Sequence, residues 1–423
     1  MKNKTNRIGG YLLIALVYFF SVILAFITDV SLSEVMSNYQ FNVLIILIVM
    51  ELFTNLVSMT GIMEVLSIKI SKKSKGNKKV ILVLFGLLMF IISAFLNNIT
   101  AVLMILPIIF VLLKTIGIDK KYLNIFFAVI LALSNTGGAS SPIGDFPAMV
   151  IMSSGITSFL GYFLKAFPFF LITSFLLISW WLLKIKDDKK NYGKKQLAID
   201  ILQSKYKHLL IKKDILIGLI IIFLLMFFAW SFIPISILSP EIIAVLGYVL
   251  AVLFCTIKKV KIVQNVDFKP ILTISSFLFL AGIVSLTGVL NEFVNYLQIN
   301  ISNPRVLLIV IMIITSMVSG IFGAGPASTT MMPIVINLCE STFSAQVDWI
   351  VIAYAASICA GSSLFMWSAT AGFILSEKIN EAEFSDELNN KLMWNISDYF
   401  KYGIQNYLIQ IIMTILIVCF IIY

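Results

Sequence analysis

Two groups of polar residues lie inside strongly apolar sequence, where a polar side chain without a partner is costly. The first group joins the stretch Asn-Asn-Ile-Thr to a later serine- and glycine-rich stretch, and its members are Asn97, Asn98, Thr100, Ser134, Asn135, Thr136, Gly137, Gly138 and Asp145. Side-chain oxygens, with carbonyls freed from an unwound helix, can coordinate a hard cation such as Na⁺. We therefore expect an ion- and substrate-binding site here, with Na⁺ at Asn97, Asn98 and Gly137. The alternative is that these residues only hold helices together.

The second group offers glycines and hydroxyls but no asparagine at its turn. It contains the turn Gly323-Ala324-Gly325 and the hydroxyl residues Ser328, Thr329, Thr330, Ser362, Ser363 and Ser368. In the first group as in this one, half-helix N-termini at the breaks present partial positive charge that suits an anion, and glycines let a substrate approach the backbone. A cation here must use hydroxyls and carbonyls. Close packing of small residues is the alternative interpretation.

Two further charged residues lie inside apolar runs. Glu51 is midway along the run 42–65, and an intramembrane carboxylate is a candidate proton or cation relay. A hydrogen-bonded structural glutamate is the alternative. Lys165 lies near one end of the run 159–183, where snorkelling to the surface is favoured over an anion-binding or gating role.

The elements that carry these residues are apolar helices. The chain is 60% hydrophobic and only 12% charged, against roughly 25% charged residues in soluble proteins. Its repeated apolar runs are long enough to cross a hydrocarbon core as helices. The first run lacks the small-residue cleavage site of a signal peptide, so it is kept as a span. These features predict an all-α integral membrane protein.

The distribution of lysine and arginine predicts how the chain threads the bilayer. Nine crossings and two re-entrant hairpins, at 80–113 and 305–339, place all but Lys165 and Arg305 of the 31 basic residues on one side. Basic residues are retained in the cytoplasm, so the N-terminus is expected inside and the C-terminus outside. Topology therefore accounts for the net charge of +10, and no nucleic-acid partner is expected.

Similar landmarks recur in the two halves of the sequence. Thr60-Gly61 and Thr287-Gly288 are 227 residues apart, Pro107 and Pro333 are 226 apart, and Gly138 and Gly361 are 223 apart. The expected topology runs the copies in opposite directions, and inverted repeats with broken helices are typical of secondary transporters.

The resulting plan has five parts. They are an N-terminal span at 1–41, a first repeat at 42–184 with a broken helix at 124–155, a basic cytoplasmic loop at 185–213, a helix pair and linker at 214–270, and a second repeat at 271–423 with a broken helix at 347–375. The segment 380–403 is expected to form an interfacial helix whose lipid-facing residues are Phe384, Leu388, Leu392, Met393 and Trp394.

The stretches "LNNITAVLMILP" and "LSNTGGASSPIGDFP" resemble the ion transporter superfamily, which includes arsenite permeases, D-type sodium/proton antiporters, citrate transporters and divalent anion/sodium symporters. The resemblance implies that Asn97, Asn98 and Thr100 form the first hairpin tip and that Gly137 and Gly138 form the break facing it. The second tip departs from the family's polar triplet. The resemblance also implies a scaffold that often dimerises and a transport part that moves.

Together these features predict a secondary active transporter. A Na⁺ or H⁺ gradient is expected to drive a small anion, a carboxylate or an oxyanion, across a bacterial cytoplasmic membrane. Sodium/proton exchange or arsenite-type efflux is the alternative within transport. A channel is argued against by closed hairpins, and an enzyme by the lack of HExxH, GxSxG or an intramembrane histidine. No cofactor is expected; the partners are the anion, the coupling cation, the bilayer and a second copy of the chain.

Overall fold

A computed structural model describes residues 2–37, 39–185, 212–234, 236–262, 268–342, 344–369, 371–385 and 391–420. The part described is almost entirely helical. Its elements are α1 (Lys2–Ile27), α2 (Leu32–Ser37), α3 (Phe41–Ser58), α4 (Ile62–Ser74), α5 (Lys78–Phe95), α6 (Asn98–Ile116), α7 (Lys120–Ala139), α8 (Phe146–Ser154), α9 (Phe159–Leu182), α11 (Lys213–Phe232), α12 (Pro240–Ile257), α13 (Phe268–Leu286), α14 (Val289–Asn300), α15 (Pro304–Phe322), α16 (Ala324–Ser341), the short 3₁₀ helix η1 (Ser344–Gln346), α17 (Val347–Ser362), α18 (Gly372–Glu381), strands β1 (Phe384–Ser385) and β2 (Lys391–Leu392), and α19 (Ile396–Phe420).

Ten helices in the described residues are long and apolar enough to cross a membrane. They are α3, α5, α6, α7, α9, α11, α12, α15, α17 with the preceding 3₁₀ turn, and α19; the apolar segments Ile14–Ile27 and Ile271–Leu286 are shorter. The prediction of an all-α, multi-pass membrane protein is confirmed. The two predicted hairpins are present as the pairs α5–α6 and α15–α16, while their re-entrant course through the bilayer stays a prediction.

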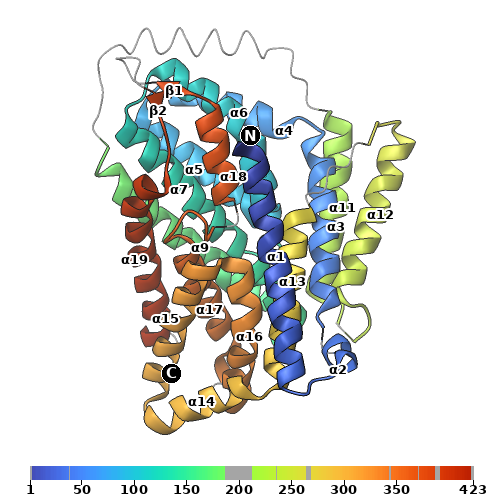
Figure 1. Ribbon diagram of the computed structural model, residues 1–423. Helices are drawn as coiled ribbons and strands as arrows, with labels where there is room; N and C mark the ends of the chain where they lie inside the picture. Colours follow the sequence, from blue (N-terminus) through green and yellow to red (C-terminus); the bar gives the residue numbers. More distant parts are fainter. Residues whose placement is uncertain are drawn as a thin grey trace.

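The apolar runs 42–65 and 271–296 each divide at the predicted Thr-Gly landmark. Gly61 and Gly288 have φ angles of 76° and 73°, the left-handed region that glycine reaches without strain. The threonine before each glycine bonds the carbonyl three residues earlier, Thr60 to Val57 and Thr287 to Val284, at 2.7 Å in both cases. The first landmark ends α3 and begins α4, and the second ends α13 and begins α14. Figure 1 shows α4 and α14 at opposite ends of the molecule.

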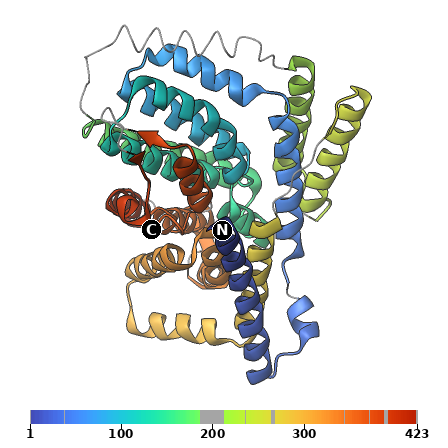
Figure 2. The ribbon, with the colours of Figure 1, turned by 45° about the horizontal axis from the view of Figure 1, so that its top comes forward.

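The two interrupted helices lie at the centre of the fold. All of the apolar window of α7 is buried, and 67% of that of α17, whereas α11 and α12 are only 22% and 28% buried. Irregular backbone at membrane depth is tolerated where protein encloses it, so the central position permits the breaks after α7 and α17. Figures 1 and 2 both show α11 and α12 at one edge of the molecule, beside α3.

Close helix contacts explain why glycine occupies one position in each broken helix. A Cβ on Gly137 would overlap the carbonyl oxygen of Phe90 in α5, and a Cβ on Gly361 would overlap that of Ser316 in α15. Each broken helix therefore touches the backbone of the first arm of its own hairpin. By this contact Gly137 in the first half corresponds to Gly361 in the second half. The landmarks in the sequence matched Gly361 with Gly138, which is one residue further along.

The predicted interfacial helix at 380–403 is wrong. Helix α18 ends at Glu381, a two-stranded hairpin follows, and α19 begins only at Ile396. Phe384 and Trp394 are 1% and 0% exposed, because they pack against protein. Phe384 forms an edge contact with Phe110 in α6, and the Trp394 backbone exchanges hydrogen bonds with the Asn380 amide. Phe384, Leu392 and Trp394 thus complete the core instead of facing lipid, whereas Met393 is 45% exposed and Leu388 lies outside the described residues.

Candidate functional site

The tip of the first hairpin meets the break between α7 and α8 through side chains. Asn98 Nδ2 donates to Asp145 Oδ2 at 2.8 Å, and the two residues are only 1% and 5% exposed. Gly138 lies against both, since a Cβ there would be 2.6 Å from Asp145 Cβ and 2.8 Å from Asn98 Oδ1. The contact thus brings together a buried carboxylate, a side-chain amide and the bare backbone of a glycine. The residues that provide them lie up to 47 positions apart in the sequence.

Local structure fixes this geometry. Asn97 caps α6, because its side chain accepts the Ile99 amide hydrogen at 2.9 Å and leaves Asn98 in the first turn. Asp145 caps α8, because its Oδ1 accepts the Phe146 amide hydrogen at 2.9 Å. Capping is the ordinary role of asparagine and aspartate at helix starts. Here it leaves Asp145 Oδ2 for Asn98 and satisfies the positive end of α8 with a carboxylate.

A second polar contact joins the two broken helices directly. Asn135 Nδ2 in α7 donates to Ser362 Oγ in α17 at 3.0 Å, and both residues are buried. Cys359 Sγ lies 3.4 Å from the Asn135 carbonyl oxygen. The last turns of α7 and α17 therefore meet in the middle of the molecule, so the first and second polar groups are neighbours in space.

Several buried oxygens in this region accept no hydrogen bond from the described residues. They are Asn98 Oδ1, Asn135 Oδ1, Ser134 Oγ and Ser93 Oγ. Buried polar atoms are normally paired, and leaving one unpaired costs about 1–3 kcal/mol. Amide and hydroxyl oxygens are suitable ligands for a hard cation, so the donor set in the first half fits Na⁺.

The second hairpin meets its break through neutral groups: a peptide–peptide contact, and the Trp367 indole, whose Nε1 donates to the Ile321 carbonyl at 3.2 Å. The Ala324 amide donates to the Ser368 carbonyl at 3.3 Å, and Gly323 has a φ of 97°. The hydroxyls of Ser328, Thr329 and Thr330 each bond a carbonyl of the preceding turn, at 2.7, 2.9 and 2.9 Å. Ser363 Oγ accepts from Gln410 Nε2 at 2.8 Å. This half presents hydroxyls and peptide groups, with no carboxylate among these contacts.

Glu51 also touches the first hairpin. Thr100 Oγ1 donates to Glu51 Oε1 at 2.9 Å, which joins α3 to the first turn of α6. Thr136, by contrast, pairs with Ser174 in α9 at 2.9 Å, and Gly137 packs on α5. Of the three residues expected at Na⁺, only Asn98 is at the Asp145 contact; Asn97 acts as a cap, and Gly138 takes the place expected of Gly137.

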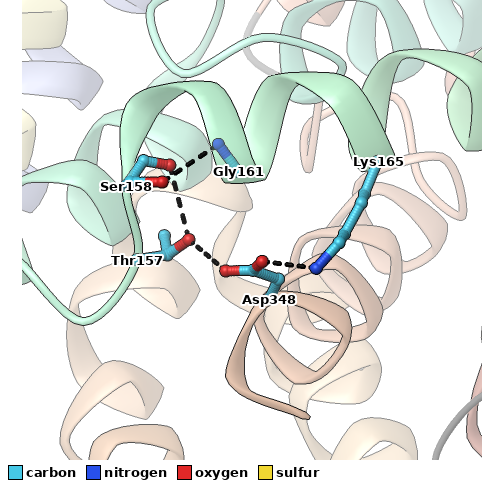
Figure 3. Close-up of polar contacts among 5 residues, drawn as sticks. All are labelled: Thr157, Ser158, Gly161, Lys165 and Asp348. Carbon is cyan, nitrogen blue, oxygen red and sulfur yellow. Dashed lines mark hydrogen bonds and ion pairs between the residues drawn. The ribbon is translucent and has the colours of Figure 1, made fainter. Parts of the chain in front are cut away.

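An ion pair that sequence reasoning missed links the two halves at their ends (Figure 3). Lys165 Nζ in α9 lies 2.5 Å from Asp348 Oδ2 in α17, and Thr157 Oγ1 donates to Asp348 Oδ1 at 2.6 Å. Lys165 thus has a partner on another helix, where snorkelling was the favoured expectation. The signal was available, because the predicted topology starts both spans at the same face and gives them opposite charges.

Two buried tyrosines were also missed. Tyr162 donates to the Ala139 carbonyl at the end of α7 at 2.7 Å, and Tyr354 donates to the Ser328 carbonyl at 2.6 Å. Tyr162 satisfies a carbonyl at the end of α7, and Tyr354 satisfies one near the start of α16, the second arm of its hairpin. Aromatic residues are common throughout the apolar runs, so neither the type nor the spacing of these two tyrosines distinguishes them in the sequence.

Comparison with known proteins decides the family. The sequence profile of the citrate transporter family matches residues 4–359. This chain belongs to the citrate transporter family. Among related proteins, the 46 kDa membrane protein of Mycobacterium leprae is 24% identical over 345 residues, covering 81% of this chain and 79% of the relative. An uncharacterized transporter of Mycobacterium tuberculosis is 24% identical over 306 residues, covering 71% and 69%.

Magnetosome protein MamN of Paramagnetospirillum magneticum is a further relative of this citrate transporter family member. It is 26% identical over 340 residues, covering 79% of this chain and 75% of MamN. The family match spans both hairpins and α7–α8, together with most of α17. The chain is therefore a membrane transporter, in agreement with the predicted resemblance.

Proposed function

We propose that this protein is a secondary active transporter that couples the movement of a small carboxylate or oxyanion to a Na⁺ or H⁺ gradient. The observation that carries the proposal is the buried contact of Asn98 with Asp145, beside the bare backbone of Gly138. A buried carboxylate is stable only when a cation, a proton or hydrogen bonds compensate it. Asp145 and the free oxygen of Asn98 together form a place where a cation or proton can bind.

The anion is assigned to the second half. Helix α16 begins at Ala324, directly after its cap residue Gly323, and its positive end is not capped by a side chain. The hydroxyls of Ser362 and Ser363 lie at the end of α17, next to the contact with Asn135. Peptide N–H groups and hydroxyls bind anions well at helix starts. Cation and anion sites would then be neighbours across the contact between α7 and α17.

The matched landmarks of the two halves support alternating access by an inverted repeat. Following the basic residues, we place the N-terminus in the cytoplasm, the C-terminus outside and the protein in a bacterial cytoplasmic membrane. A homodimer formed by the scaffold helices is part of this proposal.

Purified protein in proteoliposomes tests the coupling. We expect uptake of a labelled anion, with citrate, succinate and phosphate as the first probes, to follow an imposed inward Na⁺ or H⁺ gradient. Asn98→Ala should reduce this uptake sharply. Asn124→Ala is the matched control, since Asn124 is a buried asparagine at the other end of α7.

Sodium/proton exchange is the second candidate. Two carboxylates, Asp145 and Glu51, contact the same hairpin tip through Asn98 and Thr100. Alternating proton and Na⁺ at such groups would exchange the two ions without an anion. If Na⁺ flux in proteoliposomes needs no anion and drives protons in the opposite direction, the protein is a sodium/proton exchanger and the proposal of anion transport is wrong.

A further inference from the structure

A basic hollow lies where α11 begins and α12 ends, away from the site described above. Its volume is about 460 Å³, and its lining residues are Lys212, Lys213, Asp214, Ile215 and Lys258. Three lysines face one aspartate, so the hollow has an excess of positive charge. Among the described residues, none of these lysines forms an ion pair. The hollow therefore suits an anionic group.

The helices that carry the hollow expose apolar faces. On α12, Leu250, Leu253 and Ile257 recur at helical spacing and lead directly to Lys258; Ile257 is 77% exposed. On α11, Ile217 and Ile221 form a similar exposed row, four and eight residues beyond Lys213 and therefore on the same face of the helix. Such faces in a membrane protein contact acyl chains. The hollow thus lies at the boundary between an apolar helix surface and the polar end of the pair.

We infer that this hollow binds the phosphate headgroup of an anionic phospholipid, with the acyl chains lying along α11 and α12. The lysines provide charge for the phosphodiester, and the exposed apolar rows that adjoin Lys213 and Lys258 form the surface that the chains would cover. Basic hollows at the ends of membrane helices are suited to lipid headgroups. A free phosphate would use the lysines and leave the exposed apolar rows unused, which favours the lipid.

A lipid bound in the hollow would also stabilise the neighbouring helices, because Lys212 is hydrogen-bonded to the turn that follows α3. The Lys212 amide donates to the Thr60 carbonyl at 3.1 Å, and Thr60 precedes the left-handed Gly61 at which α3 turns into α4. A headgroup held by Lys212, Lys213 and Lys258 would therefore steady the corner between α3 and α4 together with the edge pair α11–α12.

Thermal unfolding of the full chain in detergent tests this inference. Three additives are compared: dimyristoylphosphatidylglycerol, dimyristoylphosphatidylcholine and glycerol 3-phosphate. We expect only phosphatidylglycerol to raise the unfolding temperature of the wild type by several degrees. Lys213→Gln with Lys258→Gln should require roughly tenfold more of this lipid for half of the effect, because each lysine near an anionic headgroup adds several-fold to affinity.

Two further double variants control for charge alone. Lys259→Gln with Lys261→Gln removes the same charge from neighbouring residues that do not line the hollow, and it should respond as the wild type does. Lys213→Arg with Lys258→Arg keeps the charge and should keep the response. Equal responses of the two glutamine variants would overturn the inference. Equal stabilisation by phosphatidylcholine would also overturn it, because the site would then have no preference for an anionic headgroup. Equal stabilisation by glycerol 3-phosphate would overturn it too, because the site would then bind free phosphate.

Discussion

In the first half of the molecule the hairpin tip meets its helix break through a carboxylate, and in the second half through neutral groups, among them a peptide–peptide contact. Asn98 donates to the Asp145 carboxylate at 2.8 Å, whereas the Ala324 amide donates to the Ser368 carbonyl at 3.3 Å. The backbone plan is otherwise similar, with Gly137 against α5 and Gly361 against α15.

The difference indicates a division of labour within the proposed function. A carboxylate can exchange a proton for a cation, and its hydrogen bond to an amide responds to that exchange. A peptide–peptide contact has no ionisable group and serves as a fixed surface with partial positive charge. We therefore assign coupling to the first half and anion recognition to the second, and the following variants test that assignment.

Asp145→Asn is expected to have the largest effect. A buried hydrogen bond to a charged group contributes about 1.5–3 kcal/mol, so we expect gradient-driven uptake to fall roughly 10- to 100-fold. Ser368→Ala leaves the peptide contact and removes only neutral hydrogen bonds, since the hydroxyl accepts from the Phe365 amide at 3.2 Å and donates to the Phe365 carbonyl at 2.7 Å. A smaller loss, roughly tenfold, is expected for these two neutral bonds. Initial uptake rates in proteoliposomes at equal protein content measure both. Equal losses would mean that the two halves share the coupling step.

The glycine contacts should have large and equal effects on stability if the halves share one backbone plan. Gly137→Ala and Gly361→Ala each place a methyl group against a carbonyl of the neighbouring helix, which costs roughly 1–3 kcal/mol as overpacking. Thermal unfolding in detergent measures the change. Gly282→Ala is the control, because a Cβ there meets only Val35, at 3.7 Å. A Gly361 variant as stable as the Gly282 variant would contradict the close contact in the second half.

Glu51→Gln sharpens the comparison between the halves. Helix α3 offers this carboxylate to the first hairpin, whereas Leu278 in α13 occupies the corresponding position of the second half, 227 residues later. Glutamine keeps an acceptor for the Thr100 hydroxyl, so uptake at the best pH should change by less than about tenfold. If Glu51 carries a proton, the variant flattens the pH profile of transport. Thr100→Ala removes the hydrogen bond and keeps the carboxylate, and it should keep the profile. An unchanged profile in Glu51→Gln makes this glutamate structural.

Sequence predicted the helical architecture, both hairpin turns and both breaks well. The length of an apolar run and the turn preference of a residue such as Gly323 are local properties that can be read without knowledge of the packing. Asn98, Gly138 and Asp145 were likewise found as one group, since polar residues stand out in apolar sequence. The partners within the group could not be assigned. Which oxygen Asp145 offers, and whether Gly137 or Gly138 faces Asn98, depends on helix rotation by a single residue.

The error at 380–403 has a different cause. Amphipathic spacing predicted a surface helix, but Phe384 packs against Phe110 in α6 and Trp394 packs against Tyr399 in α19. Hydropathy does not distinguish a side chain that faces lipid from one that faces protein, since both surroundings are apolar. The structure resolves this because Trp394 lies against Tyr399 and Phe127.

The pair of Lys165 and Asp348 is expected to have the smallest effect, and it tests whether the two halves move as one body. The Lys165 side chain is 39% exposed, so solvent screens the attraction and about 0.2–1 kcal/mol of coupling is expected. A double-mutant cycle of Lys165→Gln and Asp348→Asn, followed by thermal unfolding, measures that coupling, and it should weaken in high salt. Within a body that moves as a unit, the pair persists in every state, so breaking it lowers stability and leaves the apparent affinity for the anion unchanged. A changed affinity with unchanged stability would show instead that the pair forms in one transport state only.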